Sequence, residues 1–456
     1  MKKIIIFMFV FIIFLSSCSV DSNDNLEESS QVSNIETSIG TDISYITEHS
    51  IAISDFINES SECIEDISED LNDEVMDEEF MKGVWISQFD MSGILKENGV
   101  QRDRISFEKL YRTVLSNIKN DGYNTVFVQV RPYADSFYPS EYFPPSNYVT
   151  GDFKSGLNYD PFAIIVELSK EIGLSVHAWL NPMRAMKSKE LVNVDDKYPI
   201  KQWYNDKTKN GEYIVEIEGR YYLNPAYDEV RALIAKGAKE VAENYDIDGV
   251  HIDDYFYPTK DASFDSVAYQ EYIANGGNKD LRKYRNEMLD LMVSEMYSAV
   301  KSIGKEQVFG ISPAGNIENT YNDLYTNVYK WCSEKGYIDY ICPQIYFGLE
   351  HQTHDFIKVF NTWNNIIKID SVKIYAGMTL GKAKSGVDNY AGKGKLEWTE
   401  NKDVLKRCLE FIKTRKECQG IVMFCYQHMY DPITGISVAE TQLERDNMKS
   451  ALNNLS

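Results

Sequence analysis

The chain has 456 residues, and its formal net charge of −23 comes from 70 acidic and 47 basic side chains. Residues 19–80 hold 19 of the acidic side chains and no lysine or arginine, so the chain beyond residue 80 is close to neutral, with 51 acidic and 45 basic side chains. Neither part carries the basic patch that binding to nucleic acid requires, and this class of function is excluded.

The first 18 residues predict export and a lipid anchor. Lys2 and Lys3 precede an apolar run at residues 4–15, which has the length of a signal-peptide core and is too short to span a bilayer. Leu15-Ser16-Ser17-Cys18 then reads as a bacterial lipobox, in which Cys18 is acylated and becomes the mature N-terminus. The alternative is a cleaved signal in which Cys18 is incidental. We therefore expect a protein tethered to the outer face of the cytoplasmic membrane.

Residues 19–80 are predicted to be a disordered linker. Dense negative charge and few aromatic residues leave this stretch without the apolar surface that a core needs. Residues 81–456 are then expected to form one domain. Five cysteines fall in that domain without a CxxC pair, and buried free thiols are the main expectation, with a Cys408–Cys418 disulfide as the alternative.

The domain alternates short β-branched or aromatic runs with helical patterns. Strands are expected at residues 83–89, 125–130, 175–180, 249–253, 307–311, 338–345, 372–377 and 420–426. Helices are expected between them, among others at residues 107–119, 161–171, 225–244, 283–303 and 404–416. Eight strands separated in this way predict a (β/α)₈ barrel. The alternative is a doubly wound open sheet. Such a sheet is expected to have a glycine-rich phosphate-binding loop after an early strand, and the sequence has none.

Two helices carry a start signal, and one loop stands out. Asp160-Pro161 and Asn224-Pro225 each place a capping side chain before a proline that suits the first helical turn. The connection at residues 181–224 is the longest between a strand and the next helix, and residues 213–217 and 220–223 are predicted to form a hairpin in it. In a barrel, the loops after the strands form the active face, so this loop is expected to be a substrate wall.

Polar and aromatic residues collect where the predicted strands end. Because these ends share one rim of a barrel, the side chains should line one cleft. Aromatic faces stack on the C–H surfaces of sugars, while amides and guanidinium groups match sugar hydroxyls. The expected substrate-binding residues are Gln129, Arg131, Asp135, Trp179, Asn181, Arg184, Tyr255, Asn316, Gln344 and Tyr346.

Asp253 and Asp254 are the candidate catalytic residues. Strand alternation sends Val250 and Ile252 outward and directs His251 and Asp253 into the barrel, while Asp254 lies where the strand becomes a loop. Adjacent acids in an apolar setting resist full ionisation, and glycoside hydrolysis needs a protonated acid beside a charged carboxylate. The alternative is a purely structural role, with hydrogen bonds to loop amides or to an arginine.

Several other polar and aromatic residues are weaker candidates. Asp135, Glu318 and Glu350 are possible second carboxylates. Trp179, Tyr346, His177 and His251 can equally be barrel packing. His351 and His354 have a spacing that weakly suggests a metal, although surface histidines are the commoner explanation, and neither a metal nor a cofactor is expected.

At these residues the sequence resembles the glycosyl hydrolase-like 10 family of bacterial envelope lipoproteins, from about Lys82 to Tyr430. The ordered segments that carry the resemblance are Gly83-Val84-Trp85, Gln129-Val130-Arg131-Pro132, Ala178-Trp179-Leu180-Asn181-Pro182, Tyr222-Leu223-Asn224-Pro225, Asp248-Gly249-Val250-His251-Ile252-Asp253-Asp254-Tyr255 and Pro343-Gln344-Ile345-Tyr346. The resemblance implies a TIM-type barrel and glycosidase activity on peptidoglycan glycan strands or a related N-acetylated polysaccharide.

Two mechanisms follow from the resemblance. The strand with Asp253 is similar to the fourth strand of amylase-type barrels, where the corresponding aspartate is a covalent nucleophile. The adjacent acids also resemble the pair of substrate-assisted hexosaminidases, in which the first orients the 2-acetamido group and the second is the general acid. We favour the second reading, with Asp254 as the acid. A non-catalytic glycan-binding lipoprotein and a metal-dependent deacetylase are the functional alternatives.

Overall fold

A computed structural model describes residues 79–454 of the chain. The predicted signal peptide, Cys18 and all but the last residues of the predicted linker lie outside this range, so those predictions stand as made. Within residues 79–454 no helix combines the length and the apolar character needed to cross a bilayer.

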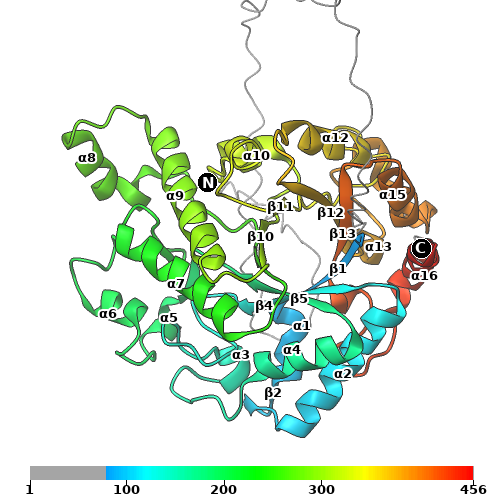
Figure 1. The fold of residues 1–456 in the computed structure, drawn as a ribbon, viewed down its shortest axis with the longest axis horizontal. Coiled ribbons are helices and arrows are strands. Elements are labelled where there is room, and N and C mark those ends of the chain that lie inside the picture. The colour runs from blue at the N-terminus through cyan, green and yellow to red at the C-terminus, as the bar shows by residue number, and fades with distance from the viewer. Residues whose placement is uncertain (1–78, 455–456) are drawn as a thin grey trace, which may run out of the picture. The chain divides into compact units, whose positions relative to one another are not determined.

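Eight parallel strands close into a barrel in the order β1-β13-β12-β11-β10-β9-β5-β4, which confirms the predicted (β/α)₈ fold (Figure 1). Strands that follow one another along the chain are neighbours in the barrel, as right-handed β–α–β connections require. The strands are β1 (Met81–Ile86), β4 (Thr125–Arg131), β5 (Ser175–Leu180), β9 (Gly249–Ile252), β10 (Val308–Ile311), β11 (Tyr340–Ile341), β12 (Lys373–Thr379) and β13 (Cys418–Phe424).

Two strands end three or more residues earlier than predicted, each for a local reason. The strand predicted at 83–89 ends at Ile86 because Ser87 and Asp90 form a capping box that starts helix α1 (Gln88–Leu95). The strand predicted at 338–345 is reduced to Tyr340–Ile341, since Pro343 has no N–H to donate. Single bridges from Gln344 to Ala314 and to Gly377 continue the pairing beyond that proline.

Helices surround the barrel (Figure 1). The longer ones are α2 (Arg104–Asn120), α4 (Pro161–Ile172), α7 (Asp228–Asn244), α9 (Leu281–Lys301), α12 (Phe356–Ile366), α15 (Val404–Lys413) and α16 (Gln442–Asn453). Asp160 caps α4 as predicted, because its side chain accepts from the backbone N–H groups of Phe162 and Ala163. The predicted cap at Asn224 is wrong: α7 begins three residues after Pro225, and Tyr227 at its cap makes no side-chain bond.

The barrel separates two apolar cores. The larger core lies between the strands and the helices and contains the outward side chains Val250 and Ile252. A smaller core fills the barrel itself and includes Trp85, Phe127 and Tyr340. This division confirms the predicted alternation along β9. All five cysteines of the domain are buried free thiols, so the alternative disulfide is not formed.

The long connection after β5 carries a small sheet of its own, in the order β6-β8-β7. The predicted hairpin is present as β7 (Ile214–Ile217) and β8 (Arg220–Leu223), with four antiparallel residue pairs. Strand β6 (Arg184–Lys187) was not predicted; it pairs with β8 on the other side. The sheet therefore brings Arg184 and Arg220 onto neighbouring strands next to the end of β5.

Candidate active site

Asp253 lies directly beyond the end of β9, and its carboxylate is only 2% exposed. Three neighbours donate hydrogen bonds to it: Trp179 Nε1 and Asn181 Nδ2, each 3.0 Å from Oδ2, and the backbone N–H of Tyr255, 3.2 Å from Oδ1. An indole N–H and a backbone N–H can only donate. The surroundings of Asp253 are therefore built for a charged carboxylate.

A chain of amides fixes the orientation of Asn181. The backbone N–H of Gln88 donates to Gln129 Oε1 at 2.9 Å, so the other end of this amide, Nε2, faces Asn181 Oδ1 at 2.7 Å. Asn181 must then present its Nδ2 to Asp253. This Gln88–Gln129–Asn181 relay joins the ends of β1, β4, β5 and β9, and it holds a donor on Asp253.

Asp254 is half-buried and differs in its surroundings. Its side chain hydrogen-bonds Gln344, whose Nε2 also donates to Ser312 O at 3.0 Å. Burial raises the pKa of the Tyr346 hydroxyl, and the nearby charge of Asp254 raises it further. The Tyr346 ring also stacks on Phe424, with the ring centroids 5.7 Å apart. Gln344 and Tyr346 thus lie beside the aspartates, as predicted, and Tyr346 also packs.

Burial raises the pKa of both aspartates. Burial, followed by the charge of Asp254, raises the pKa of Asp253 to about 7. The hydrogen bonds from its donors and the charge of Arg184 act in the opposite direction and lower this pKa. Burial also raises the pKa of Asp254, which Gln344 and Arg184 lower. Burial and the charge of Asp254 favour the proton on Asp253, whereas the three donors around Asp253 favour the charge there; the donor geometry is the basis for assigning the proton to Asp254. The pair therefore offers an acid beside a carboxylate.

Arg184, Trp179 and Tyr255 complete the wall around the pair. The Arg184 guanidinium lies over the Tyr255 ring, 3.9 Å from its centroid. The Trp179 side chain is 6% exposed and lies edge-on to His251, so it packs and donates at once. Tyr255, in contrast, is 48% exposed.

The two barrel histidines are satisfied core residues, as the plainer reading held. Tyr340 Oη lies 3.1 Å from His177 Nδ1 and 2.9 Å from His251 Nδ1, and His251 Nε2 is 2.9 Å from Ser312 Oγ. Burial lowers the pKa of His177 to about 3 and that of His251 well below its usual value. Both rings are therefore neutral and form the floor beneath the aspartates.

Three predicted substrate-binding residues lie elsewhere, which corrects the sequence analysis. Arg131 is 1% exposed and its guanidinium stacks on Phe143, 4.5 Å from the ring centroid, against Gly237 of α7. The strand register shifts between Gln129 and Arg131, so the alternation that should point Arg131 inward is interrupted. Asp135 is buried within its own loop, where it accepts from the backbone N–H of Tyr133 at 2.9 Å.

Asn316 is the third of these residues. It caps the short helix α10 (Ile317–Asn322) by accepting from the N–H groups of Glu318 and Asn319, and it contacts His354 Nε2 at 3.3 Å. Its amide is thus used for local structure rather than for the aspartate pair.

The remaining candidates make no catalytic contact with the pair. Glu318 and Glu350 are exposed, and Glu318 accepts from Asn322 within α10. His351 Nδ1 accepts from the N–H of His354 at 3.0 Å and holds its own loop. In the described part of the chain no group of three histidine, cysteine, aspartate or glutamate side chains is arranged to hold a metal ion.

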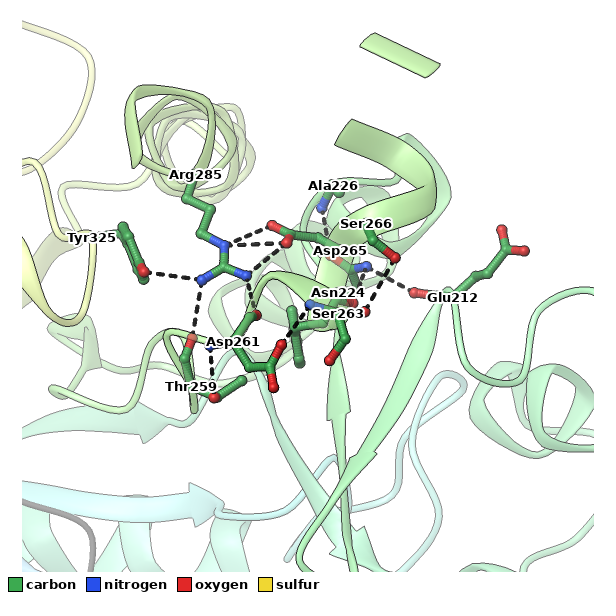
Figure 2. A network of polar contacts seen from close by, with 11 residues as sticks. Glu212, Asn224, Ala226, Thr259, Asp261, Ser263, Asp265, Ser266, Arg285 and Tyr325 are labelled. Carbon is green, nitrogen blue, oxygen red and sulfur yellow. Dashed lines mark hydrogen bonds and ion pairs between the residues drawn. The ribbon is translucent and has the colours of Figure 1, made fainter. Parts of the chain in front are cut away.

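The loop after the aspartates is anchored to α9 by Arg285 (Figure 2). Arg285 and Asp265 are both fully buried and paired, with Nη2 2.7 Å and Nε 2.9 Å from the carboxylate oxygens. The same guanidinium donates to Thr259 O at 3.1 Å and to Asp261 O at 2.6 Å. These bonds fix the chain from residue 259 to 265, which follows Asp254.

Sequence reasoning missed several residues of the site. Gln88 lies in a segment predicted as strand, and Tyr133 and Arg220 were not among the expected ligands. Tyr133 Oη accepts from Gln88 Nε2 at 3.1 Å, and Arg220 lies over the Tyr133 ring, 4.2 Å from its centroid. The contact of Arg220 with Tyr133 joins two different loops, the one after β4 and the one after β5, so no local sequence signal could have shown it.

Comparison with known proteins identifies the family of the chain. The model of the family described as Glycosyl hydrolase-like 10 matches residues 80–391. The chain is 31% identical over 326 residues to the glycosyl hydrolase YngK of Bacillus subtilis. This aligned region covers 66% of this chain and 61% of YngK. It is 26% identical over 392 residues to the glycosyl hydrolase DigH of Escherichia coli K12, covering 79% of this chain and 86% of that protein.

Solved structures show the same fold at low identity. The glycoside hydrolase domain of PgaB (BpsB) from Bordetella bronchiseptica superposes with a TM-score of 0.51 at 12% identity, covering 81% of this chain and 99% of that domain. The α-L-fucosidase isoenzyme 2 of Paenibacillus thiaminolyticus gives a TM-score of 0.50 at 12% identity, covering 82% of this chain and 49% of the fucosidase. With a family model matched over most of its length, the chain belongs to the Glycosyl hydrolase-like 10 family of glycosidases.

Proposed function

We propose that the barrel hydrolyses O-glycosidic bonds in a bacterial cell-wall glycan or a related N-acetylated polysaccharide. The observation that carries the proposal is the pair of adjacent aspartates, of which Asp253 accepts three hydrogen bonds that favour its charged form, so we assign the proton to Asp254. A protonated acid beside a charged carboxylate is what glycoside hydrolysis requires. The family assignment and the expected membrane anchor support a substrate outside the cell membrane.

The mechanism that fits best is substrate-assisted. Asp254 donates its proton to the glycosidic oxygen, and the C1–O bond breaks as the oxygen of the 2-acetamido group attacks C1. Asp253 accepts a hydrogen bond from the acetamide N–H and stabilises the positive charge of the oxazolinium ion. Water then attacks C1, returns a proton to Asp254 and opens the ring. Of the other candidate carboxylates, Glu318 and Glu350 are exposed, and Asp135 is buried in its own loop, where it accepts from the N–H of Tyr133.

A soluble form of the domain incubated with amidase-stripped peptidoglycan tests the reaction. We expect shorter glycan strands with new reducing ends, identified by mass spectrometry. Release of acetate without chain shortening would instead indicate a deacetylase. Binding without either product would indicate the alternative function of a non-catalytic glycan-binding lipoprotein.

The substrate also separates the two mechanisms. De-N-acetylated glycan should be a very poor substrate, and a thiazoline analogue of the N-acetyl sugar should inhibit. Equal rates on acetylated and deacetylated strands, or a covalent adduct trapped on Asp253, would make Asp253 a nucleophile of the amylase type.

Anchoring to the outer face of the cytoplasmic membrane is part of the proposal. It is supported by the lipobox that ends at Cys18. Replacing Cys18 by alanine should release the protein from the membrane fraction or block its maturation. Unchanged membrane association of Cys18→Ala would refute the lipid anchor and leave the proposed reaction untouched.

A further inference from the structure

We propose that Tyr255 is a sugar-stacking platform next to the catalytic acid, held in place by a stack of alternating aromatic rings and guanidinium groups. This stack consists of Tyr255, Arg184, Tyr133 and Arg220, and we call it the Tyr255 stack. The inference rests on the proposed function and deepens it, because it specifies which surface of the sugar is bound and where.

The Tyr255 stack is continuous from the rim into the protein. The guanidinium carbon of Arg184 lies 3.9 Å from the centroid of the Tyr255 ring and 4.9 Å from that of Tyr133. Arg220 lies over the Tyr133 ring as well, at 4.2 Å. Such contacts between cations and rings are each worth about 0.5–2 kcal/mol, more when solvent is excluded. Four side chains from three different loops thus form one unit.

The inner members of the stack are fixed. Arg184, Tyr133 and Arg220 are 8%, 6% and 5% exposed. The Tyr133 hydroxyl accepts from Gln88 Nε2 at 3.1 Å, and Arg220 Nη1 donates to the carbonyl of Ala185 at 2.6 Å. The stack therefore fixes the position of its outermost ring, Tyr255, before any ligand binds.

Tyr255 alone among the four is open to solvent, with 48% of its surface exposed. The Arg184 guanidinium lies over one face of its ring, so we infer that the other face is the surface offered to a ligand. Binding to a prearranged ring avoids the cost of ordering a side chain, which is about 0.5–1.5 kcal/mol. Since Tyr255 follows Asp254 directly, a sugar on this ring adjoins the bond that Asp254 would protonate.

The charge behind the ring selects the kind of ligand. A cation arriving from solvent would add a second positive charge to a ring that already has the Arg184 guanidinium carbon 3.9 Å from its centroid. Tyr133 bears two guanidinium groups, but there Arg220 is held by its bond to the carbonyl of Ala185, which a soluble ligand lacks. A neutral, partly apolar surface is favoured instead, and the C–H face of a pyranose with equatorial substituents, such as an N-acetylglucosaminyl unit, has this character. The platform therefore binds the face of a neutral sugar ring rather than a cationic group.

Binding can be measured without turnover. In full-length protein carrying Asp254→Asn, calorimetry with the N-acetylglucosamine tetramer gives a reference dissociation constant. Adding Tyr255→Leu should weaken binding about tenfold, whereas adding Tyr255→Phe should keep it within about threefold. Adding Arg220→Met, which touches no ligand, should weaken binding about threefold, and Arg220→Lys should restore most of that loss. In the otherwise unmodified enzyme, Arg220→Met should raise KM and leave kcat nearly unchanged.

Tyr390→Leu is the matched control, since Tyr390 is 63% exposed and lies outside the stack. It should bind the tetramer like the reference protein. Equal affinities of Tyr255→Leu and Tyr255→Phe, an equal loss in Tyr390→Leu, or no binding of the tetramer to the reference protein would each overturn the inference.

Its failure is distinguishable from failure of the proposed function. If the unmodified protein cleaves stripped peptidoglycan while Tyr255→Leu binds normally, only the platform is refuted. If Tyr255-dependent binding is measured and no glycan is cleaved, the platform stands and hydrolysis does not.

Discussion

Arg285→Met tests how strongly the loop that follows Asp253 and Asp254 is anchored. The substitution keeps most of the side-chain volume but removes the fully buried ion pair with Asp265 and the bonds to Thr259 O and Asp261 O. Because Asp265 would be left buried without its partner, we expect a loss of about 3–5 kcal/mol in the free energy of unfolding. That is a large share of the roughly 5–15 kcal/mol that stabilises a typical domain.

Urea denaturation followed by tryptophan fluorescence and circular dichroism measures this loss. Arg282→Met is the control on the same helix, since Arg282 is exposed and bonds Asn322, and it should cost no more than about 1 kcal/mol. The double variant Arg285→Met/Asp265→Leu should regain most of the stability, because neither charge is then buried alone. A single variant within about 1 kcal/mol of the unmodified protein would refute the anchoring argument.

Three further predictions address the site and the domain. Trp179→Phe removes the indole N–H that donates to Asp253, a charge-assisted hydrogen bond worth about 1.5–3 kcal/mol. The kcat measured in hydrolysis assays should therefore fall roughly 10–100-fold. An unchanged kcat would contradict the role of this donor. Arg184→Met removes a charge that lowers the pKa of both aspartates, so both limbs of the pH–rate profile should move to higher pH, including the alkaline limb on which the acid loses its proton. Arg184→Lys keeps the charge and should keep the profile. An unmoved profile in Arg184→Met would refute the coupling between Arg184 and the aspartates. A fragment of residues 79–456 should unfold cooperatively at the Tm of the full chain in calorimetry, and a marked drop would show that the acidic segment stabilises the barrel.

Local patterns predicted much of the fold. The barrel strand at Ser175–Leu180 and the hairpin strand at Arg220–Leu223 begin and end where the sequence indicates, because apolar side chains and turn residues act within a few positions. The same alternation places His251 inside the barrel and Ile252 outside it. Asp253, one residue farther along, is bonded by Trp179 of the inner core, in line with the inward direction that alternation predicts.

The errors arise where a distant or irregular feature overrides the local pattern. Arg131 follows a register shift in β4, so strict alternation gives the wrong direction for its side chain. Asn316 was expected to bind substrate, but its side chain satisfies the first N–H groups of α10. The contact of Arg220 with Tyr133 depends on an inserted sheet whose third strand, β6, has no strong sequence pattern.

The most direct test of the catalytic assignment is the rate at which Asp254→Asn releases reducing ends from amidase-stripped peptidoglycan. Asparagine keeps the size and polarity of the side chain but has no proton to transfer, so the account predicts a loss of about 10²–10⁴-fold with unfolding unchanged. The exposed Glu318→Gln serves as the matched control and should retain full activity. Near-normal turnover by Asp254→Asn would contradict the assignment of Asp254 as the general acid.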